Sequence, residues 1–272
     1  MIRRTEGNNR DRTIALEVMN TVTENPFSIA AGTVSQGVKR VRPYLKGYLV
    51  ADSAAPLLVW EHAYYPQYAF APDEVEVDLK EVGPGPRSKV FGPSVVYDVV
   101  VDGVATSKAA VRYPEAPETL MRDRTLFVWS AMSTWLEEDE VVHFHARNPY
   151  VRVDSLQSSR HVQIRYNGEV VADSRRPVVL FETGLTPRYY LPRTDVRMDL
   201  LTERELITHC PYKGSARYWS LQVGSQTLDD VVWGYDAPFD EARNVAGLVS
   251  FWPEKSTDLE VFVDGQRLGA PA

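Results

Sequence analysis

The sequence predicts a mainly β protein built from two tandem copies of one domain, each with a short helical segment. The strongest observation is an internal repeat, in which GYLVADS at residues 47–53 returns as GEVVADS at residues 168–174, an offset of 121. Twelve of the 33 positions in residues 47–79 are identical in residues 168–200. The second observation is that short apolar or alternating runs lie between glycine turns, a pattern typical of strands.

The repeat sets the predicted domain boundaries. We expect an N-terminal extension at residues 1–37, a divergent first copy at 38–145, a docked linker at 146–160 and a second copy at 161–272. The linker is too rich in apolar and aromatic residues to be a flexible tether. After a one-residue shift the correspondence continues through three further identities: Gly92 with Gly214, Tyr113 with Tyr235, and Leu126 with Leu248.

Local patterns predict the individual elements. Lys46-Gly47 and Asn167-Gly168 separate extended runs, and such pairs favour hairpin turns because both residues tolerate positive φ. Equivalent strands are expected at residues 56–61 and 177–182, since the second is an apolar run ending in a carboxylate. Residues 217–223 alternate between apolar and polar side chains, as a half-buried strand does.

A helical segment is expected at the end of each copy. Residues 117–138 carry apolar side chains at spacings of seven, four and four, which favours an amphipathic helix. The corresponding segment of the second copy, residues 239–249, is shorter. A further short helix is predicted at residues 13–19, with Asn25-Pro26 as its stop signal because a residue before proline avoids the helical region.

Composition limits the functional classes. The chain has 272 residues, of which 44% are apolar and 25% charged, as in soluble globular proteins. A net charge of −7 argues against a nucleic-acid partner, which would need a basic face. The longest apolar runs fall well short of a membrane span, and residues 1–12 lack the apolar stretch of a secretory signal. We therefore expect a cytoplasmic protein without a membrane partner; the oligomeric state stays open.

Metal and cofactor chemistry is not expected. The chain has one cysteine, so neither a disulfide nor a closed zinc site made of cysteines can form within it. His143 and His145 share one face at strand spacing, but two imidazoles without a nearby third ligand make a weak metal site. We expect no metal and no cofactor.

The residues of the second copy resemble a known family. The stretches FETG (181–184), RYYLP (188–192), CPYKG (210–214) and YWS (218–220) resemble the bacterial family called domain of unknown function 427. The resemblance is close over about residues 160–269 and looser over 38–145, like the tandem form found in actinobacteria. It implies a β-tent, in which two small antiparallel sheets meet at an angle. Zinc-binding relatives of that fold join the sheets with four cysteines, so packing replaces the metal here.

The resemblance brings no established chemistry. The family is sometimes filed as nucleotidyltransferase-like, but the sequence has neither a Gly-rich phosphate loop followed by lysine nor the paired acidic residues of such enzymes. Site candidates must therefore come from the residues themselves.

The corner around Cys210 is the first candidate. A thiolate forms more readily beside a cation, and Lys213 lies three residues away; the alternative is a cysteine that packs as a small apolar residue. Lys213 is an anion clamp or a tuned base on one interpretation and a solvated turn residue on the other. Gly214 would let the backbone approach a ligand. The first copy keeps the glycine, as Gly92, but has neither the cysteine nor the adjacent lysine, which points to specialisation.

Glu182 is the second candidate. It ends an apolar run, where a carboxylate can have a raised pKa suited to proton transfer. The alternative is a structural acceptor, which the presence of Glu61 at the equivalent position of the first copy favours.

Aromatic residues complete the predicted site. They form either the wall of a pocket for a small organic or cationic ligand or part of a core. The residues proposed to bind the ligand are Tyr189, Tyr190, Tyr218, Arg188, Gly214 and Trp233. Because they come from several segments, they are expected to converge in a cleft between the sheets with Cys210, Lys213 and Glu182.

Two functions from different classes fit these residues. The first is a binding module for a small-molecule ligand in the aromatic cleft of the second copy. The alternative is an enzyme, such as a hydrolase, transferase or isomerase, that uses Cys210, Lys213 and Glu182. Whether there is catalysis is left open.

Overall fold

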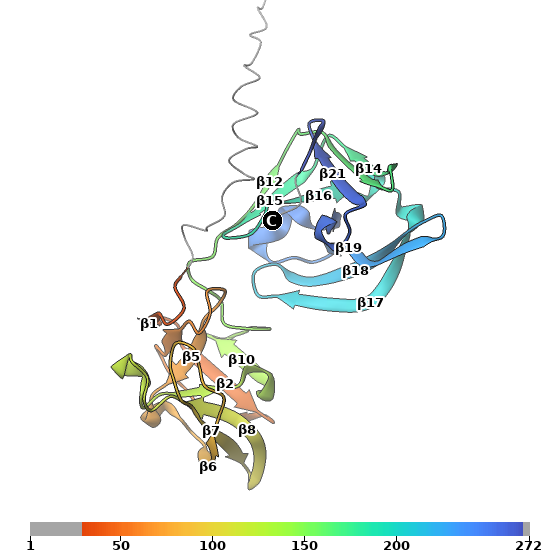
Figure 1. Cartoon of the computed structure of the whole chain (residues 1–272). Coiled ribbons are helices and arrows are strands. Elements are labelled where there is room, and N and C mark those ends of the chain that lie inside the picture. The colour runs from red at the N-terminus through yellow and green to blue at the C-terminus, as the bar shows by residue number, and fades with distance from the viewer. Residues whose placement is uncertain (1–28, 269–272) are drawn as a thin grey trace, which may run out of the picture. The chain divides into compact units, whose positions relative to one another are not determined.

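Two similar β halves make up the part of the chain that the structure describes (Figure 1). The structure is a computed structural model and describes residues 29–268. The short helix predicted at residues 13–19 lies outside them. Each half has a seven-stranded and a four-stranded antiparallel sheet, so the predicted mainly β, tandem β-tent class is confirmed.

The sheets of the first half combine strands that are distant along the chain. From one edge to the other, the seven-stranded sheet contains β1 (Val34–Gln36), β4 (Leu57–Val59), β5 (Gln67–Phe70), β9 (Thr125–Phe127), β8 (Val104–Arg112), β7 (Val95–Val101) and β6 (Asp78–Pro84). The four-stranded sheet contains β11 (Glu140–Val141), β10 (Thr134–Glu137), β2 (Val41–Leu45) and β3 (Tyr48–Leu49).

The second half repeats this order strand for strand. Its seven-stranded sheet contains β12 (Val153–Gln157), β15 (Val178–Glu182), β16 (Arg188–Pro192), β20 (Leu248–Phe251), β19 (Gln226–Tyr235), β18 (Gly214–Val223) and β17 (Leu201–Cys210). Its four-stranded sheet contains β22 (Gln266–Arg267), β21 (Leu259–Val263), β13 (Val162–Tyr166) and β14 (Glu169–Ser174). Strands β1 and β12 begin before residues 38 and 161, so each sheet starts ahead of the predicted copy boundary.

Strand register fixes which residues of the two halves are equivalent. Leu57 pairs with Ala69 as Val178 pairs with Tyr190, which preserves the offset of 121. Val96 pairs with Val111 as Tyr218 pairs with Trp233, with the offset now 122. Residues at these offsets therefore occupy the same place in the two sheets, and they can be compared one by one.

The turns also repeat. Lys46 and Gly47 have φ of 53° and 85°, and Asn167 and Gly168 have 51° and 80°, which are the values of the predicted hairpin turns. Gly92 and Gly214 both have positive φ, 83° and 92°, at the turn after β6 and β17. Glycine is required there because other residues rarely adopt this backbone conformation.

Each half has a core on both faces of its seven-stranded sheet. In the second half the inner cluster joins the two sheets and includes Tyr189, Trp219 and Val261. The outer cluster lies on the opposite face and includes Tyr190 and Tyr235 together with Val245, from the 3₁₀ helix η6 (Asp240–Val245). The first half has the same inner and outer clusters.

The prediction of a helix at residues 117–138 is wrong. That stretch contains η2 (Thr119–Met121), strand β9, η3 (Trp129–Ala131) and strand β10. Phe127 and Trp135 are buried from strands in different sheets, so their helical spacing is a coincidence of two extended segments. The segment at 239–249 is helical only in η6 and then continues into β20.

The remaining helical turns are also short 3₁₀ segments. They are η1 (Pro72–Glu74), η4 (Arg193–Asp195), η5 (Met198–Leu200) and η7 (Pro253–Lys255). Among residues 29–268 there is no helix with the length and apolar character needed to cross a membrane.

The compact units of the chain are not identical to its two halves. Residues 29–151 and His209–Gly214 form one unit, which we call the first unit. Residues 152–208 and 215–268 form the second unit. The hairpin corner between β17 and β18 therefore belongs to the first unit, although its strands belong to the second sheet system.

Candidate functional site

Strand alternation separates the two neighbouring tyrosines of β16. Tyr189 packs in the inner cluster, only 6% exposed, and its hydroxyl has no hydrogen-bond partner within residues 29–268. Burial raises its pKa, and Arg160 nearby opposes that shift. Tyr190 faces the other way, into the outer cluster. Tyr190 is 1% exposed, so both tyrosines are core residues, on opposite faces of the sheet.

Five of the predicted site residues share the outer face of the second seven-stranded sheet. Tyr218 lies directly across from Trp233 on neighbouring strands, and the Nε1–H of Trp233 donates a 3.0 Å hydrogen bond to the hydroxyl of Tyr190. Glu182 follows Val178 and Leu180 of the outer cluster at strand alternation, and Arg188 precedes Tyr190 in the same way. We call Glu182, Arg188, Tyr190, Tyr218 and Trp233 the aromatic face.

Charged groups border the aromatic face. The guanidinium of Arg188 lies 5.8 Å from the ring centroid of Trp233 and forms a 2.7 Å ion pair with Glu254. Trp252 contacts Trp233 edge to face at 6.2 Å and is 38% exposed. The ammonium group of Lys255 lies 5.0 Å from the ring centroid of Trp252. The face therefore offers the partly exposed rings of Tyr218, Trp233 and Trp252, bordered by two carboxylates and by two cations that are held in place.

The same positions in the first half carry small or aliphatic side chains. Ala69, Val96 and Val111 stand where Tyr190, Tyr218 and Trp233 stand in the second half. Phe91, from the turn before Gly92, is 1% exposed and lies 5.6 Å from the ring of Tyr113 in the outer cluster. In the first half this face is thus closed by its own turn.

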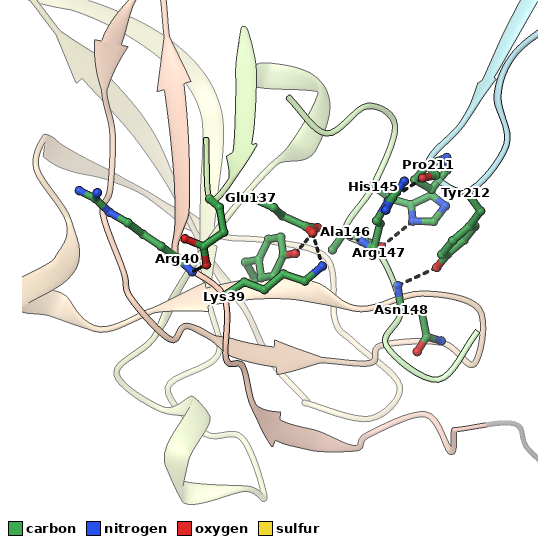
Figure 2. Close-up of polar contacts among 11 residues, drawn as sticks. Lys39, Arg40, Glu137, His145, Ala146, Arg147, Asn148, Pro211 and Tyr212 are labelled. Atoms are coloured by element: carbon green, nitrogen blue, oxygen red, sulfur yellow. Dashed lines mark hydrogen bonds and ion pairs between the residues drawn. The ribbon is translucent and has the colours of Figure 1, made fainter. Parts of the chain in front are cut away.

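The Cys210 corner is held in the first unit by main-chain and hydroxyl contacts. The Nε–H of Arg147 donates a 2.6 Å hydrogen bond to the carbonyl of Pro211, and the backbone N–H of Asn148 donates one of 2.6 Å to the hydroxyl of Tyr212 (Figure 2). Cys210 is half-buried with a free thiol. Pro211 and Tyr212, rather than Cys210, carry these contacts.

A buried carboxylate lies beside this segment. Glu137 is 7% exposed and accepts a hydrogen bond from Lys39 at 2.5 Å (Figure 2). It also accepts hydrogen bonds from the hydroxyl of Tyr68 at 2.5 Å and from the backbone N–H of Arg147 at 3.3 Å. Burial raises the pKa of Tyr68 strongly, and the negative charge of Glu137 adds to this. The hydroxyl of Tyr68 therefore stays protonated and acts as a donor.

Four of the five histidines gather in the first unit near the corner. The ring of Tyr65 stacks on that of His145, with 3.9 Å between the ring centroids, and contacts the ring of His62 edge to face at 4.4 Å. The ring centroids of His143 and His209 lie 6.1 Å apart. Nevertheless, no group of three or more potential ligand side chains within residues 29–268 could hold a metal ion. The imidazoles pack as aromatic rings.

The predicted constellation is divided between the two units. Cys210, Lys213 and Gly214 belong to the first unit, whereas Glu182, Arg188, Tyr190, Tyr218 and Trp233 form one face in the second. Convergence of all these residues with Tyr189 in one cleft is not found within either unit and stays a prediction. Sequence reasoning missed Tyr68 and Glu137, because residues so far apart along the chain show no common pattern. Tyr212 lies within the CPYKG stretch, but the sequence predicted no role for it.

The architecture defines a class: a tandem-repeat β protein whose two copies share a scaffold and differ in their outer faces. The chain belongs to the family described as domain of unknown function DUF427, whose sequence profile matches residues 33–138 and 154–265, one match in each half. The predicted two-copy membership is confirmed. No curated protein matches the chain significantly.

Proposed function

We propose that the chain binds a small organic molecule on the aromatic face of the second unit. The observation that carries the proposal is the difference between equivalent positions, where Tyr190, Tyr218 and Trp233 replace Ala69, Val96 and Val111. Packing alone would be served by aliphatic side chains, as in the first half. Tyr218 and Trp233, both partly exposed, instead provide flat apolar area with polar ends over the buried Tyr190, which suits a ligand.

The chemistry of the face favours a planar or cationic ligand. Aromatic rings attract cations over their faces and stack on flat apolar groups. Arg188 and Lys255 already lie over the Trp233 and Trp252 rings, so these rings accept positive charge in the structure itself. Glu182 adds a carboxylate at the end of β15, which favours a positively charged group on the ligand.

The ordering of the face supports a binding role. The hydrogen bond from Trp233 to Tyr190 fixes the orientation of both rings, and the hydroxyl of Tyr218 lies 2.9 Å from that of Thr208. Rings held in place lose little conformational freedom when a ligand arrives, which increases affinity.

The test uses a panel of small planar and cationic compounds, with tryptophan fluorescence and thermal shift as readouts. We expect Trp233→Val, which restores the first-half residue, to weaken binding of any hit by about tenfold or more. The matched control is Phe181→Leu, because Phe181 is an exposed aromatic residue on the neighbouring position of β15 and points to the opposite face. Equal losses in both variants would contradict the proposal.

A second arm separates binding from thiol chemistry. Cys210→Ser should leave ligand affinity within a few-fold of the unchanged protein, because Cys210 is not one of the residues of the aromatic face. An enzyme that needs the thiol would instead lose turnover by orders of magnitude. Such a loss, measured on a ligand that the protein converts, would replace the binding module with the enzyme.

A further inference from the structure

A pocket of about 510 Å³ lies in the first unit, and its lining contains no residue of the Cys210 corner. Its lining includes Tyr97, Arg112, Leu120, Arg122 and Arg124, with Asp123 as its acidic residue. The lining therefore has three arginines and one aspartate, so it carries a positive charge although the whole chain has a net charge of −7. The volume is in the range of sites for small molecules.

Two of these arginines are held by neutral groups. The Nε–H of Arg112 donates to the hydroxyl of the buried Thr125 at 2.8 Å, and its guanidinium lies 5.1 Å from the ring centroid of Tyr97. The Nε–H of Arg122 donates to the carbonyl of Ala116 at 2.9 Å. Neither forms an ion pair within residues 29–268. Arg124 has a loose pair with Glu74, at 3.8 Å. The guanidinium groups are thus positioned while their charge is largely uncompensated.

The second half also has an arginine over the equivalent aromatic ring, although from another position in the fold: Arg193 corresponds to Pro72, and Arg112 corresponds to Gly234. Trp219 is the counterpart of Tyr97, and the guanidinium of Arg193 lies 5.1 Å from its ring centroid. Asp236 forms ion pairs with Arg193 at 2.8 Å and with Arg217 at 3.1 Å. At the offset of 122, the first-half residue equivalent to Asp236 is Pro114, which lines the pocket. The carboxylate that compensates the arginine in one half is therefore absent at the equivalent place in the other.

We propose that this pocket binds the oxyanion of a small molecule, a phosphate or a carboxylate group, with Arg112 and Arg122 as its main ligands. The planar guanidinium presents paired N–H donors that match both groups. Fixing one N–H of Arg112 on Thr125 leaves its remaining donors for the anion and reduces the ordering cost of binding. Leu120 and Pro72 offer apolar walls to the rest of the ligand. The site lies in the other unit from the aromatic face, so the two proposals are independent.

The test is calorimetric titration of the full chain with inorganic phosphate and, separately, with malonate, at constant ionic strength set by chloride. We expect saturable binding of at least one of the two anions at a single site. Arg112→Gln and Arg122→Gln should each weaken it by about tenfold, because each removes charge-assisted hydrogen bonds. The matched control Arg193→Gln removes the compensated arginine of the second half and should change the affinity less than about twofold.

The outcomes decide the proposal and the anion. Binding of phosphate alone assigns the pocket to phosphate groups, and binding of malonate alone assigns it to carboxylates. Absence of saturable binding, or an equal loss in Arg193→Gln, overturns the proposal. Arg122 is exposed, so Arg122→Gln should not destabilise the fold, and it remains a valid test if Arg112→Gln lowers the melting temperature. Unchanged anion affinity in Arg122→Gln also overturns the proposal.

Discussion

The outer faces of the two seven-stranded sheets have the same strands in the same order but different contents. In the first half, Phe91 from the β6–β7 connection covers an aliphatic face beside Tyr113. In the second half, the residue equivalent to Phe91 is Lys213, and aromatic rings occupy the sheet positions. The backbone ladders do not depend on side-chain size, so the scaffold persists while the face is rebuilt. The repeated scaffold therefore carries two different outer faces.

On the inner face the two halves differ in how deeply an equivalent aromatic residue is buried. This difference gives the largest expected effect on stability. Trp60 is fully buried, whereas its counterpart Phe181 is 39% exposed. We expect Trp60→Ala to lower the free energy of unfolding by about 3–5 kcal/mol, because it leaves a cavity. Phe181→Ala should cost below about 1 kcal/mol, since little area is lost from the core. The free energy of unfolding of both variants is measured by urea denaturation. Similar losses of stability in the two variants would show that the halves are packed alike.

A pair of equivalent tyrosines gives the next effect. Tyr68 donates to the buried carboxylate of Glu137, whereas the buried hydroxyl of Tyr189 has no partner within residues 29–268. Tyr68→Phe should cost about 1.5–3 kcal/mol, the range for hydrogen bonds to charged groups. Tyr189→Phe should be neutral or slightly stabilising, because it loses no hydrogen bond and removes a buried polar atom. The free energy of unfolding of both variants is measured by denaturant unfolding. An equal loss of stability in Tyr189→Phe and Tyr68→Phe would contradict the difference between the two tyrosines.

The smallest effect concerns acid stability. Hydrogen bonds from Arg176, and also from Ser174 and Thr194, lower the pKa of Asp195 to about 2, from an ordinary value of 3.8. Since the folded pKa is the lower one, this carboxylate stabilises the fold above about pH 4 and loses its contribution as the pH falls towards about 2. Arg176 is largely exposed, so solvent screens the pair and the effect is small.

The test compares Asp195→Asn with the unchanged protein at about pH 7 and at about pH 2.5 by thermal unfolding. We expect a modest loss at neutral pH that shrinks in acid, because protonation then removes the same interaction. Asp102→Asn is the control, since Asp102 lies in an exposed turn and has no ion pair within residues 29–268. A difference that grows on acidification would contradict the assignment.

The parts of the fold that depend on neighbouring residues could be predicted from the sequence. The two hairpin turns and the glycine shared by Gly92 and Gly214 follow from local backbone preferences, and the repeat relates the two halves. The helix expected at residues 117–138 failed because apolar spacing cannot distinguish one helix from two strands buried in different sheets. Only the tertiary pairing of β9 with β5 and of β10 with β2 decides it.

The candidate site was predictable in its residue types but not in its grouping. The sequence indicated Tyr190, Tyr218 and Trp233, but also Tyr189, which strand alternation turns to the inner core. That Tyr218 faces Trp233 follows from the register of β18 and β19, including a bulge between Trp219 and Leu221, and no local pattern encodes that register. The arginine pocket was missed because its residues come from separate segments of the chain.

The assignment of His209–Gly214 to the first unit affects how the protein can be divided. A cut between residues 151 and 152 separates the two sheet systems, yet it takes Pro211 and Tyr212 away from Arg147 and Asn148, their hydrogen-bond partners. The amino-terminal fragment would then expose a main-chain N–H and a guanidinium that the intact chain satisfies. A short synthetic peptide covering residues 209–214 would supply the missing acceptors in trans. The boundary between the two repeated sheet systems is thus not the boundary between the two compact units.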